Sequence, residues 1–144
     1  MFTSVQSRAA AVYQRVAVET SVQGADPHQL VGLLFDALLR SIAEARGALL
    51  RHDTAAKGMA LGKAVRILEE GLKAGLNVRE GGDLANNLQA LYDYSILRLT
   101  QANLRNDERA LEEVVQLIEP VAQSWKLIKG PGPAYLQPVT ASGV

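Results

Sequence analysis

Few side chains in this sequence are of types and spacings that could carry out chemistry. The two histidines are His28, in the first turn of an expected helix, and His52, in an expected loop. Helical bundles that bind metal through carboxylates need paired Glu-x-x-His ligands facing inward, and the chain has no such pair. The absence of cysteine excludes disulfides and thiolate metal sites.

No other pattern points to catalysis. The serines, histidines and aspartates are not spaced as a catalytic triad, and Gly81-Gly82 predicts a turn rather than a phosphate-binding loop. Neither His28 nor His52 suits phosphotransfer, which needs an exposed histidine on a helix flank, so both are predicted to be solvated surface residues. We therefore expect no enzymatic activity, no cofactor and no metal.

Composition favours one helical domain. A chain of 144 residues with 48% apolar but only 5% aromatic residues is typical of helices packed on helices. Fifteen basic and fifteen acidic residues leave no net charge to attract nucleic acid or an anionic membrane. The start of the chain lacks the apolar stretch of a secretory signal, and the apolar run Leu30–Phe35 is far shorter than the roughly 20 residues of a membrane span. These features favour a protein without membrane insertion that is either cytoplasmic or exported by a route that leaves no such mark.

Each expected helix follows an aspartate, a residue whose carboxylate accepts hydrogen bonds from the free amides of a first helical turn. The strongest signal is Asp26-Pro27-His28-Gln29, which combines a cap, a proline at the first helical position and the glutamine of a capping box. The predicted helices span 27–51, 53–76, 83–104 and 107–129, with caps at Asp26, Asp53, Asp83 and Asp107.

Short connections between helices of similar length force neighbours to run antiparallel. The predicted fold is therefore all-α, an antiparallel up-down-up-down four-helix bundle over residues 25–130, with an extra N-terminal helical or lid segment at 1–24. A tail rich in proline and glycine, 131–144, is expected to be disordered. Pro120 lies inside the last helix, but the apolar stripe keeps its phase across it, so one bent helix is predicted, with Pro120 on its polar side.

The second helix has an unusually wide apolar face. Its core stripe contains Leu61, Val65, Leu68, Leu72 and Leu76. A second stripe of mostly small residues runs beside it, and the two together cover roughly 200° of the helix, about twice the usual width. The second stripe is either internal packing of the bundle or a groove for a partner helix. Its members are Ala60, Ala64, Ile67, Gly71 and Ala74.

An ordered set of short motifs runs through the chain. It begins with Tyr13, Val18-Glu19-Thr20 and Asp26-Pro27-His28-Gln29-Leu30-Val31, and continues with Gly81-Gly82-Asp83-Leu84-Ala85-Asn86-Asn87-Leu88, Leu91-Tyr92-Asp93-Tyr94, Arg98-Leu99, Ala102-Asn103, Asp107 and Trp125. This set resembles the flagellar secretion chaperones, the flagellin-specific export chaperones of bacteria, over about residues 10–129. The resemblance implies a cytoplasmic chaperone that binds the C-terminal segment of flagellin, prevents premature polymerisation and helps present flagellin to the flagellar type III export gate.

The candidate partner-binding residues come from three parts of the chain. The small-residue stripe is the first, and the apolar N-terminal segment with Tyr13 and Val16 is the second, as a lid over the client groove. Asn87, Tyr94 and Arg98, on one flank of the third helix, are the third. Two other functions stay open: a phosphotransfer or other signalling bundle, and a structural protein that self-associates through the small-residue stripe.

Overall fold

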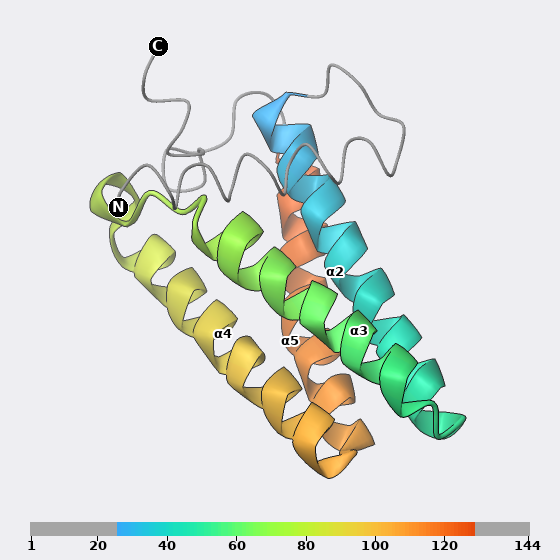
Figure 1. Ribbon diagram of the computed structural model, residues 1–144. Coiled ribbons are helices and arrows are strands. Elements are labelled where there is room, and N and C mark those ends of the chain that lie inside the picture. Colours follow the sequence, from blue (N-terminus) through green and yellow to red (C-terminus); the bar gives the residue numbers. More distant parts are fainter. Residues whose placement is uncertain (1–25, 129–144) are drawn as a thin grey trace.

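The computed structural model describes residues 26–128. Figure 1 shows that the long helices run alternately up and down, so that the first described residues and the last lie at the same end of the bundle. In the described range there is no strand, and the predicted all-α, up-down-up-down bundle is confirmed. The elements are α2 (Pro27–Leu50), α3 (Thr54–Arg66), η1 (Ile67–Lys73), α4 (Val78–Arg105) and α5 (Glu108–Leu127).

Three of the four predicted aspartate caps are confirmed. The Asp26 side chain accepts from the Gln29 amide at 2.8 Å, and the Gln29 side chain accepts from the Asp26 amide at 3.1 Å, which completes the capping box. Asp53 accepts from the Ala56 amide at 3.1 Å, and Asp107 caps α5 in the same way. These local signals fix where α2, α3 and α5 begin.

The fourth cap was predicted at the wrong residue. Asn77, rather than Asp83, caps α4, and its side chain accepts from the Glu80 amide at 3.2 Å. The helix is interrupted at Gly82, whose φ of 58° lies in the left-handed region. Glycine adopts this conformation without the clash that a Cβ would cause, so the glycine pair does form a turn, but one inside α4.

The helix predicted over residues 53–76 consists of two elements, α3 and η1. α3 continues into η1, a π-helix in which hydrogen bonds span five residues, as in the bond from the Ala74 amide to the Glu69 carbonyl at 3.2 Å. α5, by contrast, is one continuous helix that includes Pro120, which confirms the predicted single helix.

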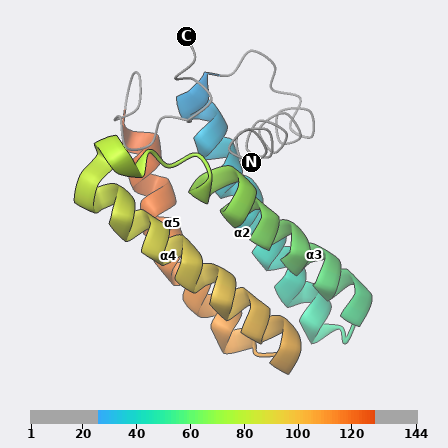
Figure 2. The ribbon, with the colours of Figure 1, turned by 60° about the vertical axis from the view of Figure 1, so that its left-hand side comes forward.

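The core fills the space between the four helices. Its largest fully buried side chains include Phe35 of α2 and Tyr92 of α4. α2 packs along both α3 and α5, and α4 packs along α5 and η1, an arrangement that Figure 2 shows from a second direction. The predicted core leucines of the second helix, Leu61, Leu68, Leu72 and Leu76, are buried, and Val65 is partly buried against them.

A buried lysine joins two helix ends. Lys57, near the start of α3, is only 4% exposed. Its ammonium donates to the Asn103 carbonyl at 2.9 Å and to the Asn106 side chain. Asn106 ends α4 with a left-handed φ of 52°, a conformation that asparagine tolerates better than most residues. The contact satisfies a carbonyl that has no partner within its own helix.

Candidate functional site

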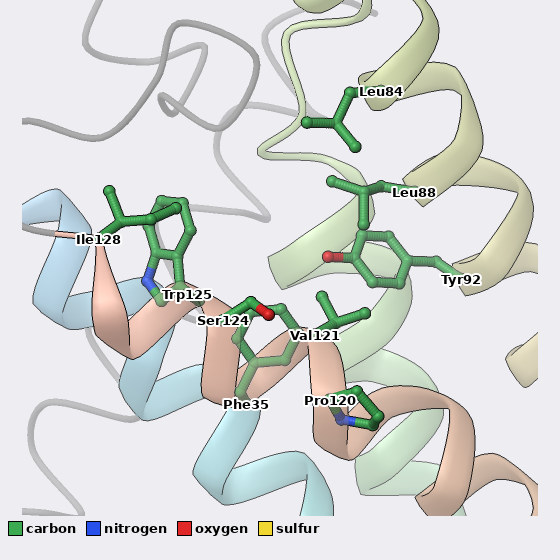
Figure 3. Close-up of a pocket in the computed structure, with 9 residues that line it drawn as sticks. All are labelled: Phe35, Leu84, Leu88, Tyr92, Pro120, Val121, Ser124, Trp125 and Ile128. Carbon is green, nitrogen blue, oxygen red and sulfur yellow. The ribbon is translucent and has the colours of Figure 1, made fainter.

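An apolar pocket of about 320 Å³ opens at the end of the bundle where the described chain begins and ends. Residues spaced by four along α4 form one wall, the last turns of α5 form the other, and Phe35 of α2 closes the bottom (Figure 3). This volume is within the usual range for small-molecule and peptide pockets. The lining residues are Phe35, Leu84, Leu88, Tyr92, Pro120, Val121, Ser124, Trp125 and Ile128.

The pocket has a buried floor and an open rim. Phe35, Leu88 and Trp125 are almost completely buried. Leu84 is 45% exposed at the rim, and Pro120 is exposed as well. None of the described residues that line the pocket is charged, so it suits an apolar side chain rather than an ion or a charged metabolite. Exposed apolar surface of this kind is typical of sites that bind other polypeptide segments.

Trp125 is held in place by α2. Its indole Nε1 donates to the His28 carbonyl at 2.8 Å, and the two rings stack with their centroids 4.3 Å apart. These contacts join the last turn of α5 to the first turn of α2. They also correct the prediction for His28, which is half-buried against Trp125 rather than solvated. His52 is exposed, in a turn, as predicted.

The small-residue stripe lies inside the bundle. Ala60, Ala64 and Ile67 belong to the hydrophobic core, with exposed fractions of 8%, 0% and 3%. Gly71 is buried as well, and Ala74 packs against the core. The interpretation of this stripe as an open groove is therefore wrong, and the alternative of internal packing describes it. The reason is that α3 and η1 pack against both α2 and α4, which requires a wide apolar arc.

Two other glycines of α3 face open space. A Cβ added at Gly58 or Gly62 would meet no heavy atom within 4 Å. Neither glycine is needed for close helix packing, although a glycine inside a helix costs about 1 kcal/mol relative to alanine.

Tyr94 and Arg98 meet on a carboxylate of α5. The Tyr94 hydroxyl donates to Glu113 at 2.7 Å, and the Arg98 Nε donates to the other oxygen of the same carboxylate at 2.6 Å. The hydrogen bond from Tyr94 has the larger effect and the one from Arg98 the next, and both hold the pKa of Glu113 below its ordinary value. The hydrogen bond between Tyr94 and Glu113 also raises the pKa of the Tyr94 hydroxyl. Asn87 is exposed about two helical turns earlier on α4, outside this cluster.

The remaining predicted site residues, Tyr13 and Val16, lie outside the described residues. Within residues 26–128, no group of three or more histidines, aspartates or glutamates is placed to hold a metal ion. None of the helices in that range is both long enough and apolar enough to cross a membrane.

The sequence prediction missed the rim of the pocket. Pro120 was placed on the polar side of its helix, whereas it borders the apolar opening (Figure 3). Leu84, Leu88 and Tyr92 recur at intervals of four, which is a detectable apolar stripe on α4. That signal identifies a buried face, but it does not reveal that one end of the face is left open.

Comparison with known proteins identifies the family. The chain matches the family described as "Flagellar protein FliS" over residues 9–131. The chain belongs to the FliS family. It is similar to the flagellar secretion chaperone FliS of Salmonella typhimurium, with 51% identity over 116 residues, which are 81% of this chain and 86% of that protein. It is also similar to the flagellar secretion chaperone FliSB of Pseudomonas aeruginosa, with 43% identity over 113 residues, 78% of this chain and 89% of that protein.

A more distant member is the flagellar secretion chaperone FliS of Bacillus subtilis, 32% identical over 108 residues, which are 75% of this chain and 79% of that protein. The resemblance that the ordered motifs indicated is confirmed. The FliS match includes all four helices of the bundle and therefore every residue of the end pocket. Residues 132–144 lie beyond it.

Proposed function

We propose that this FliS-family chain is a cytoplasmic export chaperone that binds the C-terminal segment of flagellin. It prevents flagellin from polymerising prematurely and aids its delivery to the flagellar type III export apparatus, where a component of the export gate receives the complex. The observation that carries the proposal is an open apolar pocket, with no charged residue in its described lining, on a member of a family of flagellar secretion chaperones.

The pocket suits a segment that folds as it binds. Phe35, Leu88 and Trp125 form a buried floor on which an apolar side chain loses contact with water. Leu84 and Pro120 form a rim that a second apolar side chain of the same segment can cover. An amphipathic helix supplies such pairs of side chains at intervals of three or four residues.

Two further contact regions belong to the proposal. Asn87, Tyr94 and Arg98 lie on an exposed flank of α4 and offer polar groups to the client. The N-terminal segment with Tyr13 and Val16 is a lid that leaves when the client binds. If the segment is a lid, deletion of residues 1–18 raises the association rate of the client and leaves its dissociation rate unchanged. If the segment instead clasps the bound client, the same deletion raises the dissociation rate.

Co-expression with flagellin tests this function. Full-length flagellin is expected to form a soluble complex with the chain, and flagellin without its C-terminal segment is expected to form none. Calorimetry of the isolated client segment should give a large negative heat-capacity change, and circular dichroism should show a gain of helix, because binding and folding are coupled. Equal binding of intact and truncated flagellin contradicts the proposal.

The same preparation distinguishes the two alternative functions. Mass measurement without flagellin shows whether the chain forms a stable homo-oligomer, and incubation with a phosphodonor tests for acid-labile phosphate on His28 or His52. A stable homo-oligomer that does not bind flagellin would favour the structural function, and a phosphorylated histidine would favour the signalling function. Either result contradicts the chaperone proposal.

A further inference from the structure

α4 carries a line of apolar side chains on the face that points away from the bundle. The helix packs against α5 on one side and against η1 and α3 on the other, and α2 lies diagonally opposite, so α4 forms a corner of the bundle (Figure 2). On the outward face of this corner, Tyr94, Leu97 and Leu104 are 41%, 53% and 79% exposed. Exposed apolar residues that are scattered singly need no explanation, but three of them along one line of one helix indicate a contact surface.

The spacing of this line is that of a coiled-coil seam. Five residues follow one another at intervals of four, three, four and three, an alternation that keeps one face of a helix in contact with a second helix. They form the α4 seam: Ala90, Tyr94, Leu97, Gln101 and Leu104. Ala90 is exposed and Gln101 is half-buried, so a second helix has access to the whole seam.

The α4 seam runs away from the points where the described chain begins and ends. Asp26 and Ile128 lie at the end of the bundle that holds the apolar pocket, whereas Leu104 lies near the opposite end of α4 (Figure 1). The pocket lining contains none of the seam residues. A helix that packs on the seam therefore leaves the pocket open.

The charged residues beside the seam favour a second copy of the chain in parallel orientation. Asp93 flanks the seam on the side of η1, where it pairs with Lys73 at 2.6 Å, and Arg98 flanks it on the side of α5, where it pairs with Glu113. In a parallel pair of identical helices, Asp93 of each copy faces Arg98 of the other, five positions later on the opposite flank. The Asp93 side chain is still 51% exposed and can accept this second contact. An antiparallel pair would instead place the flanks that carry Arg98 and Arg105 against each other, which like charges disfavour.

We propose that two copies of this chain pair through the α4 seam, with the two α4 helices parallel and in register. Each seam residue then faces its own equivalent, and the two Gln101 amides hydrogen-bond to each other. The seam is only about 22 Å long, and stable interfaces bury about 1,200 Å² or more, so the pair dissociates on dilution. Tyr94 and Arg98 are also contacts of the proposed client, so a client and a second copy exclude each other on this flank. The pairing itself does not rest on the proposed function.

Sedimentation equilibrium of the full chain, without any client, tests the pairing. Between about 5 µM and about 1 mM, the average mass is expected to rise from 15.5 kDa towards twice that value. Leu97→Glu places two like charges at the centre of the pair and should weaken the pairing about tenfold or more. Met59→Glu, at a position that is 77% exposed on α3, is the matched control and should leave the pairing unchanged. Circular dichroism verifies that both variants fold. A chain that stays at 15.5 kDa at the highest concentration, or an equal effect of the two substitutions, overturns the proposal.

Single thiols report the orientation of the pair, because the chain has no cysteine. Ala90→Cys and Leu104→Cys are treated with oxidised glutathione, each alone and then mixed, with Met59→Cys as the control. A disulfide forms only where the two Cα atoms approach within about 7 Å. In the parallel pair, each seam variant links to itself about tenfold faster or more than the control does. An antiparallel pair centred on Leu97 links the two seam variants only to each other, and this result overturns the proposal. So does self-linking that appears only after residues 1–18 or 131–144 are deleted, because a segment of the same chain then covers the seam.

Discussion

Replacement of Trp125 by phenylalanine tests how the end of the bundle is held together. The indole donates to the His28 carbonyl at 2.8 Å and is 3% exposed, so the substitution removes one hydrogen bond and part of a buried ring. The carbonyl keeps its intrahelical partner, the amide four residues later in α2, and the hydrogen bond is therefore worth about 1 kcal/mol rather than the larger cost of an orphaned group. The smaller ring buries roughly 40 Å² less, which costs about another 1 kcal/mol.

The expected loss for Trp125→Phe is therefore about 2 kcal/mol, or a fall in Tm of roughly 4–8 °C for a chain of this size. Urea unfolding followed by circular dichroism measures it, since the variant no longer contains tryptophan. Leu127→Ala is the control, because Leu127 is 80% exposed and its truncation should change the free energy of unfolding by less than about 0.5 kcal/mol. If Trp125→Phe costs no more than this control, the indole does not join α5 to α2 in the way described.

Three further substitutions test other parts of the account. Ala64→Phe overpacks the core and should lower the free energy of unfolding by about 1–3 kcal/mol in urea titrations, and unchanged stability would place Ala64 outside the core. Gly62→Ala should raise the melting temperature, because it removes the cost of about 1 kcal/mol that glycine has inside a helix and the added Cβ meets no neighbour. A destabilised variant would show that a neighbour lies closer than described. The pKa of Glu113 is lowered by hydrogen bonds from Tyr94 and Arg98, so its contribution to stability is present above its ordinary pKa of 4.5 and is lost as the pH falls through the lowered value. Glu113→Gln should therefore be less stable than the natural chain near neutral pH and nearly equal to it in acid, and a gap that does not depend on pH would refute this.

Local signals predicted most of the fold. Asp26, Asp53 and Asp107 act within three residues of themselves, so the sequence determines the starts of α2, α3 and α5. The start of α4 was missed because Asn77 and Asp83 are both good caps, and Gly82 interrupts the helix between them. Only the packing of the completed bundle decides that the residues before Gly82 join α4.

The candidate site was harder to predict, because periodicity reports which side chains avoid water but not what covers them. The small residues Ala60 and Ala64 produce a wide apolar face, which fits a partner groove as well as a helix with bundle neighbours on two sides. In the structure both residues are buried between bundle helices. The end pocket depends on three helices converging at one end, a relation absent from any single stretch of sequence. His28 was misplaced for the same reason, since its neighbour Trp125 is 97 residues away.

Binding of the flagellin C-terminal segment to two matched variants tests the central claim most directly. Leu84→Glu places a charge at the rim of the pocket, where the leucine is 45% exposed, and Leu104→Glu places the same charge near the other end of the same helix. Both positions are exposed enough for the variants to fold, which circular dichroism verifies. Calorimetric titration should show that Leu84→Glu weakens binding about tenfold or more, a loss of about 1.4 kcal/mol, while Leu104→Glu binds as the natural chain does. Equal affinity of the two variants would show that flagellin does not bind at this pocket.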